Sequence, residues 1–234
     1  FFAYLLKSGR SVGAVTNNAL KTGAEYSDKL ASMGINLDSA SIFTSGWAAA
    51  QYVRERSEAA TVFLVGGDAL RTELETVGAV ESEQPDFVVA GIDLTLPLQR
   101  LSDAVAHVRN GAQLIVTNPD LTVPIEGGLR AGAGAVQAFI EAAGGVKATV
   151  IGKPQKAIFL QALSGLGLNA NETMMVGDTV ETDIRGARAA KLRSVLVESG
   201  NVNVSNITAD IQVKDISDLH EMFATFDRQK GDLA

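Results

Sequence analysis

Short apolar runs alternate along most of the chain with longer stretches that have the 3.6-residue period of a helix. The runs are rich in Val, Ile and Leu, and they end in Gly, Asn, Asp, Thr or Pro. Near-continuous apolar character of this kind indicates parallel strands that are buried on both faces. The predicted strands cover residues 12–15, 61–65, 87–90, 113–116, 149–151, 173–176 and 194–197.

Helices are predicted between these strands, at residues 24–32, 48–55, 69–77, 98–109, 133–142, 155–166, 182–190 and 217–226. The alternation predicts an α/β protein with a mainly parallel, doubly wound sheet. In such sheets ligands bind at the carboxyl ends of the strands. The polar residues that directly follow the strands are therefore the candidates for a functional site.

The composition narrows the choice of partners. With 234 residues, 46% of them hydrophobic, the chain can bury one large core or two smaller ones. Its formal net charge is -7 and no basic run with interleaved aromatics occurs, so nucleic acid is a poor candidate partner. The absence of cysteine excludes disulfides and thiolate chemistry. No membrane span or signal peptide is apparent, and a cytoplasmic location is the default expectation.

The first residues are unusual for an α/β protein. Phe1, Phe2, Leu5 and Leu6 have helical spacing and lead into the strand at 12–15 without a capping residue or an earlier strand. A right-handed crossover helix normally connects two parallel strands. We therefore expect one strand to be missing ahead of this helix.

Two strand ends carry a Thr-Asn pair. Thr16, Asn17 and Asn18 offer a hydroxyl, two amides and backbone N–H groups ahead of a helix, which suits an anion. Ordinary turn and helix-capping chemistry explains the same residues when they are considered alone. Thr117-Asn118 repeats the pattern after the strand at 113–116. The residues themselves leave two rival candidates for a phosphate-binding strand end.

Charged residues follow two further strands. Lys153 lies between a strand end and Pro154, where its ammonium can pair with an anionic oxygen. Asp178 follows Gly177 at the end of another strand, and Asp183 lies in the first turn of the next helix. Hard oxygen ligands at a strand end suit Mg²⁺, which often takes only one or two carboxylates. A solvent-facing loop lysine, a plain turn and a favourable helix-start charge are the simpler alternatives.

Three other sequence features give little support for a different kind of functional site. The glycine-rich stretch at 127–134 lacks G-x-G-x-x-G spacing, and Pro124 lies where its leading strand should be. His107 and His220 have no partner at metal-ligand spacing, so they are expected to be satisfied surface histidines. No G-x-S-x-G elbow supports a serine hydrolase.

Taken together, the strand-end motifs resemble motifs two, three and four of haloacid dehalogenase phosphatases, in order and in spacing. These motifs are Thr16-Asn17-Asn18, Gly152-Lys153-Pro154 and Gly177-Asp178 with Thr182-Asp183. The subgroup with an α/β cap between motifs two and three fits best, namely the relatives of NagD, 4-nitrophenylphosphatase and the phosphoglycolate and pyridoxal phosphate phosphatases. Further matching segments are Phe43-Thr44-Ser45, Val65-Gly66-Gly67, Pro85-Asp86-Phe87-Val88-Val89, Thr117-Asn118-Pro119-Asp120 and Ala131-Gly132-Ala133-Gly134-Ala135.

The resemblance implies a three-layer core with an inserted cap. The core would comprise residues 1–57 and 148–234, and the α/β cap residues 58–147. It assigns Thr16 to the core motif and places Thr117–Asp120 in the cap, where this segment could face the leaving group of the substrate. Oligomeric state stays open, although capped relatives often form a homodimer through the cap.

The implied activity is Mg²⁺-dependent hydrolysis of small phosphorylated metabolites, such as sugar phosphates, nucleotides, phosphoglycolate or 4-nitrophenyl phosphate, through an aspartyl-phosphate. Thr16, Asn17 and Asn18 would hold the phosphoryl group, and Lys153 would offset its charge. Asp178 would bind Mg²⁺, and Asp183 would support the metal directly or through water.

The sequence departs from the family pattern in two respects. The Asp-x-Asp-Gly motif that supplies the nucleophile is absent from the chain, so we expect the 234 residues alone to have little turnover. A non-catalytic protein that keeps the phosphate site for binding is the alternative. Lys191 stands where the family usually has glycine, and a left-handed backbone there would cost about 1 kcal/mol.

Overall fold

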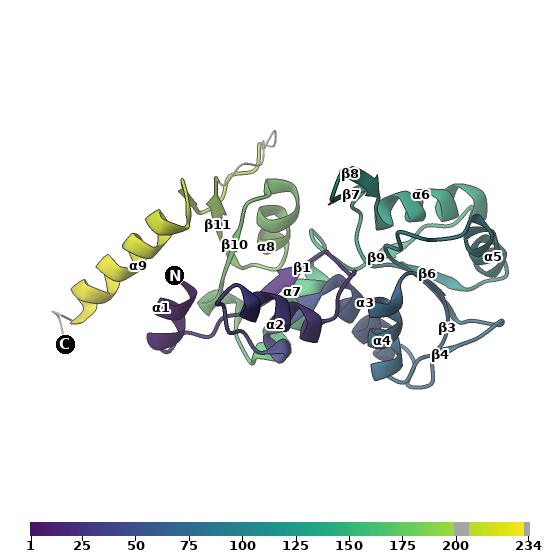
Figure 1. Cartoon of the computed structure of the whole chain (residues 1–234), viewed down its shortest axis with the longest axis horizontal. Helices are drawn as coiled ribbons and strands as arrows, with labels where there is room; N and C mark the ends of the chain where they lie inside the picture. The colour runs from purple at the N-terminus through teal and green to yellow at the C-terminus, as the bar shows by residue number, and fades with distance from the viewer. Residues whose placement is uncertain (199–205, 232–234) are drawn as a thin grey trace.

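The computed structural model describes residues 1–198 and 206–231, which form two lobes arranged along the long axis of the molecule (Figure 1). The strands are β1 (Ala14–Thr16), β2 (Ile42–Thr44), β3 (Thr61–Val65), β4 (Val80–Glu81), β5 (Phe87–Ala90), β6 (Gln113–Val116), β7 (Thr122–Ile125), β8 (Gly128–Ala131), β9 (Thr149–Val150), β10 (Met174–Gly177), β11 (Arg193–Val197) and β12 (Ile211–Val213). The α-helices are α1 (Phe2–Lys7), α2 (Gly23–Ser32), α3 (Ser45–Arg54), α4 (Asp68–Thr76), α5 (Leu98–Arg109), α6 (Ala133–Gly144), α7 (Lys156–Leu166), α8 (Arg185–Ala189) and α9 (Ile216–Gly231).

One lobe is built on a five-stranded parallel sheet of order β4-β3-β5-β6-β9. Successive side chains of β3 point to opposite faces, as the pleat requires. Val62 and Leu64 pack in the cluster that contains α3 and α4, whereas Phe63 and Val65 pack in the cluster that contains α5 and α6. Both faces of this sheet are therefore covered by helices, which confirms the predicted α/β class and explains the continuous apolar runs.

The other lobe holds two groups of parallel strands. β1 pairs with β2, and β10, β11 and β12 form a second sheet in that order. Val15 of β1 and Met175 of β10 both pack against the cluster that contains Ile158 and Phe159 of α7. Helix α7 thus supports both groups, and it holds the carboxyl ends of β1 and β10 in one region of the molecule.

Helix α3 connects the two lobes. It contacts α4 in one lobe and α7 in the other. Ala48, Ala49 and Val53 of α3 are fully buried in the same hydrophobic cluster as Leu64 and Phe159. The apolar core is consequently continuous from the five-stranded sheet to α7.

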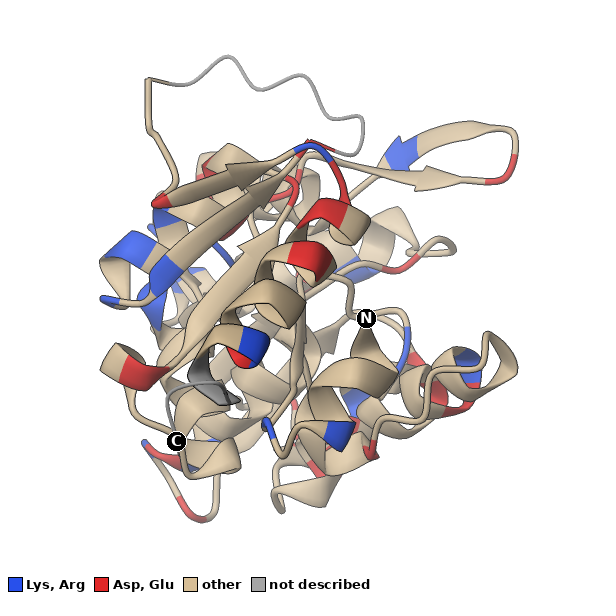
Figure 2. Ribbon diagram, turned by 90° about the vertical axis from the view of Figure 1, so that its left-hand side faces the viewer, with Lys and Arg blue, Asp and Glu red and all other residues tan. Residues whose placement is uncertain are grey.

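Most predicted elements are confirmed to within three residues at each end, but the strands β2, β4 and β12 and a hairpin were not predicted. β7 and β8 pair antiparallel, with Pro124 opposite Leu129, and extend away from the rest of the molecule (Figure 2). The prediction that Pro124 excludes a strand was wrong, because proline is tolerated in a strand whose outer edge bonds no neighbour. The φ of Gly127 is +84°, which suits the two-residue turn between the strands.

Two further observations concern the boundaries. β9 hydrogen-bonds to β6, so residues 149–150 belong to the same sheet as β3, β5 and β6. The division at 147 and 148 between cap and core stays a prediction. Lys191 has a φ of 61°, so it adopts the left-handed backbone at the position where the family usually has glycine.

The predicted N-terminal helix is α1, and it packs on α9 from the other end of the chain (Figure 1). Arg10 donates to both oxygens of Asp227 at 2.6 and 2.9 Å, and Tyr4 donates to the same carboxylate. The rings of Phe1 and Phe223 lie 5.7 Å apart. Within residues 1–198 and 206–231, no helix is both long and apolar enough to cross a bilayer.

Candidate active site

All six residues predicted for the site line one cavity of about 340 Å³. Thr16, Asn17 and Asn18 come from the turn after β1, Lys153 from the loop after β9, and Asp178 and Asp183 from the segment after β10. The lobe that contains the five-stranded sheet forms the opposite wall of the cavity. The residues of this wall are Ile92, Asn118, Asp120, Thr122, Val123, Pro124, Gly132 and Ala133. The cavity therefore lies between the two lobes.

The turn after β1 is held by its own side chains. The hydroxyl oxygen of Thr16 accepts a hydrogen bond from the Asn18 backbone N–H at 3.1 Å. The side-chain oxygen of Asn18 accepts one from the Leu20 N–H at 2.9 Å. Turn chemistry and a place in the cavity wall thus occur together, so the two sequence interpretations do not compete.

Asn17 is the most connected residue of this turn. Its side-chain nitrogen donates to the carbonyl of Lys153 at 2.9 Å and to a carboxylate oxygen of Asp120 at 3.1 Å. Its backbone carbonyl accepts from the Ser45 hydroxyl at 2.5 Å and from the Asn118 amide at 2.8 Å. These bonds fix Asn17 to segments from both lobes.

Gly152 is required for this arrangement. A Cβ atom there would lie 2.6 Å from the side-chain oxygen of Asn17 and 2.5 Å from the carbonyl of Thr117. The Gly152 N–H also donates to the Thr117 carbonyl at 2.7 Å. Glycine ahead of Lys153 therefore allows the two Thr-Asn strand ends to approach the same loop.

Lys153 and Asp183 form a buried ion pair. The ammonium of Lys153 lies 2.6 Å from one carboxylate oxygen of Asp183, and the two side chains are 13% and 5% exposed. The other Asp183 oxygen accepts from the Thr179 N–H at 3.2 Å. A Cβ on Gly177 would lie 2.4 Å from the Asp183 carboxylate, so the glycine before Asp178 makes room for it.

A π-type turn, Val180–Ile184, replaces the predicted start of the helix at residue 182. Such turns carry an extra residue per turn and are frequent at functional sites. Here the turn buries Asp183 and directs it to Lys153. The helical period of the sequence gave no sign of this turn, because the apolar positions Val180 and Ile184 suit an ordinary helix equally well.

Two carboxylates of the cavity fit the modest requirement of Mg²⁺ for protein ligands. Asp178 accepts from the Thr179 hydroxyl at 3.1 Å and lines the cavity. Both oxygens of Asp183 already accept from protein donors, which favours a supporting role for Asp183 over direct ligation. Among the residues that the structure describes, no group of three or more His, Cys, Asp or Glu could hold a metal.

The segment Thr117–Asp120 resolves the rivalry between the two Thr-Asn pairs. Thr117 and Asn118 are buried, at 0% and 4% exposure, and Asn118 bonds to the turn after β1. The two strand ends therefore build one site. The bonds from Asn118 and Asp120 to Asn17 were not predicted, although the repeated Thr-Asn pattern marked both strand ends.

Asp120 is an unusual carboxyl group. Burial raises its pKa above the ordinary value, and the nearby Asp183 charge acts in the same direction. The hydrogen bond from Asn17 and the charge of Lys153 lower its pKa and only partly offset the effect of burial.

The discounted histidines lie outside the cavity. His107 packs on Phe63 with ring centroids 4.4 Å apart, and His220 packs on Tyr4 at 4.7 Å. Each is thus accounted for by aromatic packing.

Comparison with known proteins agrees with the geometry. The model of haloacid dehalogenase-like hydrolases matches residues 1–80, and that of HAD-hydrolase-like proteins matches residues 150–219. An acid sugar phosphatase of Staphylococcus aureus (strain USA300) is 36% identical over 97% of this chain and 90% of its own. The crystal structure of a double mutant thermostable NPPase from Geobacillus stearothermophilus matches with a TM-score of 0.90 and 38% identity, over 93% of this chain and 89% of its own. NagD from E. coli K-12 matches with a TM-score of 0.85 and 29% identity, over 92% of this chain and 88% of its own.

The fold and the site thus define a hydrolase of the haloacid dehalogenase superfamily, to which the chain belongs. Within this superfamily it is a phosphoric monoester hydrolase of the subgroup that contains NagD and the 4-nitrophenylphosphatases.

Proposed function

We propose that the protein hydrolyses small phosphate monoesters with Mg²⁺, through an aspartyl-phosphate, and that its substrates are phosphorylated metabolites of sugar phosphate size. The observation that carries the proposal is the convergence of Thr16, Lys153 and Asp178 on one cavity. Its volume of about 340 Å³ is at the lower end of small-molecule sites, which span about 300–1,000 Å³. A phosphoryl group with a small leaving group suits such a space.

The chain's own residues bind and orient the phosphoryl group in this proposal. The Thr16 hydroxyl and the backbone N–H of Asn17 donate to its oxygens. The Asn18 backbone N–H keeps the Thr16 hydroxyl in place by donating to its oxygen. Lys153 keeps donors beyond the one used by Asp183, because an ammonium has three, and it offsets the negative charge. Asp178 is the ligand that holds Mg²⁺, with Asp183 in support. When bound, Mg²⁺ supplies charge neutralisation at the phosphoryl oxygens.

The nucleophile is proposed to be an aspartate outside these 234 residues, on a strand that pairs between β1 and β10. In the described part of the chain, β1 bonds only β2 and β10 bonds only β11, so each strand has one edge without a strand partner. Both strands also lie over α7. A parallel strand between them would end at the cavity, since the carboxyl ends of β1 and β10 are there.

The test is release of phosphate from 4-nitrophenyl phosphate by the 234-residue chain and by the chain extended through the residues encoded upstream. We expect Mg²⁺-dependent turnover from the extended protein and little from the shorter one. Negligible release in every condition, with retained phosphate binding, would favour a non-catalytic binding protein. If the extended protein does release phosphate, a screen of sugar phosphates, nucleotides, phosphoglycolate and pyridoxal phosphate would define the substrate.

The acid sugar phosphatase of S. aureus supports sugar phosphates as the first class to screen. The cavity wall on the cap side mixes the hydroxyl of Thr122 and the carboxyl of Asp120 with apolar Ile92, Val123 and Pro124. A hydroxylated leaving group matches this mixture of polar and apolar surface.

A further inference from the structure

Asp120 lies at the contact between the cap segment and the phosphate-binding turn. The Asn17 side-chain nitrogen has two hydrogens, and it uses one for the Lys153 carbonyl and one for Asp120. With both bonds made, the amide plane of Asn17 has a single orientation. Loss of the Asp120 bond would leave this plane held at one point.

Asp120 is itself held firmly in place. Its backbone carbonyl accepts from the Gly134 N–H at 3.0 Å, and its N–H donates to the Asn118 side chain at 3.1 Å. A Cβ on Gly132 would lie 2.3 Å from the Asp120 carbonyl, and one on Gly134 would lie 2.2 Å from the Pro119 carbonyl. The start of α6 is therefore packed directly against the backbone of this segment. Asp120 can act as a fixed point from which Asn17 is oriented.

We propose that Asp120 is a positioning residue for phosphate binding, which acts through the side chain of Asn17 to hold the Thr16–Asn18 turn in its binding geometry. The inference rests on the proposed function, in which this turn grips the phosphoryl group. It differs from the role implied by the resemblance, in which the segment faces the leaving group.

Whether Asp120→Ala weakens or tightens phosphate binding distinguishes a positioning role from a purely electrostatic one. Asp120 carries negative charge when ionised, and it lies in the wall of a site for an anion. If only charge mattered, Asp120→Ala would tighten phosphate binding. If Asp120 positions the turn, the same substitution weakens phosphate binding. Asp120→Asn removes the charge but keeps a carbonyl oxygen that can accept from Asn17, so it should preserve binding.

The experiment measures the dissociation constant of inorganic phosphate by calorimetry, with Mg²⁺ present, for the 234-residue chain and its variants. We expect Asp120→Ala to weaken binding about 10-fold, which corresponds to loss of one charge-assisted hydrogen bond. Asp120→Asn should stay within about threefold of the unchanged chain. Glu126→Ala is the matched control, because Glu126 is exposed at the hairpin tip and its loss changes the net charge equally.

A double-mutant cycle shows whether Asp120 acts through Asn17. In an Asn17→Ala background, adding Asp120→Ala should weaken phosphate binding by less than about twofold, because the shared interaction is already gone. Full multiplication of the two single effects would overturn the proposal, as would tighter binding by Asp120→Ala or an effect equal to that of Glu126→Ala.

The outcome is distinguishable from that of the proposed function. Asp120-dependent phosphate binding without turnover in the extended protein would sink the phosphatase activity and keep the positioning role. Turnover together with unchanged phosphate binding in Asp120→Ala would do the reverse. Absence of phosphate binding by both the unchanged chain and the extended protein would overturn both.

Discussion

The ammonium of Lys153 and the carboxylate of Asp183 lie 2.6 Å apart although 30 positions separate them in the sequence. Their contact joins the loop after β9 to the π-type turn after β10. Asp183 is only 5% exposed, and Lys153 offsets the cost of burying its carboxylate. Two of the three strand-end motifs are therefore coupled before any ligand arrives.

In the extended protein, Lys153→Met should abolish phosphate release and also destabilise the fold. The substitution leaves a buried carboxylate without its cation, which costs about 3 kcal/mol, the lower end for buried pairs, because the cavity admits water. Urea unfolding would measure the loss. Adding Asp183→Asn should restore most of the stability and none of the activity. Equal stability of the single and double variants would contradict the coupling.

Asp178→Asn should remove Mg²⁺-dependent activity while leaving the free energy of unfolding nearly unchanged. Asp178 is half-buried at the cavity wall, and an amide is a poorer ligand for Mg²⁺ than a carboxylate. A Mg²⁺ titration of 4-nitrophenyl phosphate hydrolysis by the extended protein checks this. Glu181→Gln, an exposed change three positions away, is the control. Activity that keeps the normal Mg²⁺ dependence would reject Asp178 as the ligand.

Gly177→Ala should impair both folding and activity. The added Cβ would lie 2.4 Å from the Asp183 carboxylate, so either Asp183 or the β10 end must move. Overpacking of this kind costs about 1–3 kcal/mol. Gly67→Ala serves as the control, because its added Cβ would meet its nearest atom at 3.7 Å. Thermal unfolding and phosphate release of the two variants of the extended protein would be compared, and equal behaviour would argue against a steric role for Gly177.

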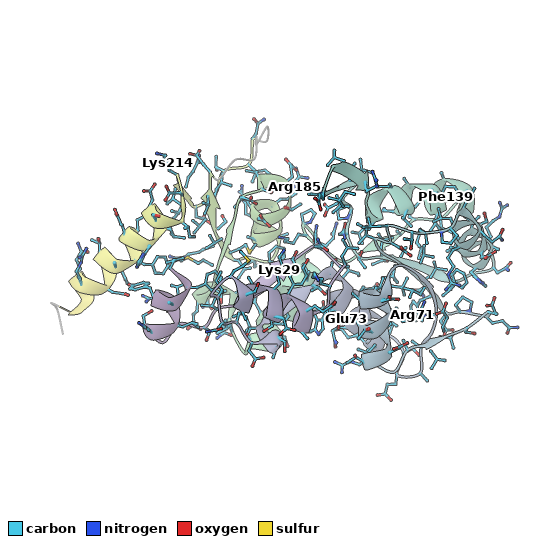
Figure 3. The ribbon with its side chains drawn as sticks, viewed as in Figure 1. Lys29, Arg71, Glu73, Phe139, Arg185 and Lys214 are labelled. Carbon is cyan, nitrogen blue, oxygen red and sulfur yellow. The ribbon has the colours of Figure 1, made fainter. Side chains whose placement is uncertain are left out.

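Glu73→Gln should flatten the dependence of stability on pH. Glu73 projects from α4 near the start of α2 (Figure 3), and burial raises its pKa above the ordinary 4.5, against the hydrogen bond from the Gly23 N–H. A raised pKa means that the folded state holds its proton more tightly. Stability is then full below pH 4.5 and falls as pH rises through the folded pKa.

The measurement for Glu73 is urea unfolding between about pH 4 and pH 7. The stability of Glu73→Gln relative to the unchanged protein should rise with pH over this window. Glu75→Gln, an exposed change on the same helix, should follow the unchanged protein. A difference that shrinks with pH would show that Glu73 is stabilised in its charged form.

The strands and the class of fold could be predicted from the sequence because a strand that is buried on both faces consists of consecutive apolar residues. Val62 to Val65 must all be apolar when one pair faces α3 and α4 and the other faces α5 and α6. The strand-end residues were readable for a related reason, since topology alone brings the carboxyl ends of parallel strands together.

Other parts of the site depend on contacts that periodicity does not encode. The bonds of Asn118 and Asp120 to Asn17 join residues more than 100 positions apart, and no local pattern specifies them. The π-type turn at Val180–Ile184 places Asp183 through a single extra residue within a helical pattern. The hairpin was missed because the rule against proline in strands applies to interior strands, whereas Pro124 lies at an edge.

The continuous cluster around α3 has a consequence for how the molecule responds to heat or denaturant. Ala48 and Val53 contribute to the packing of both lobes, so neither lobe can melt without exposing apolar surface of the other. The free energies of unfolding of the two lobes are therefore coupled. A destabilising substitution near α7 should also reduce the protection of β3 amides against hydrogen exchange.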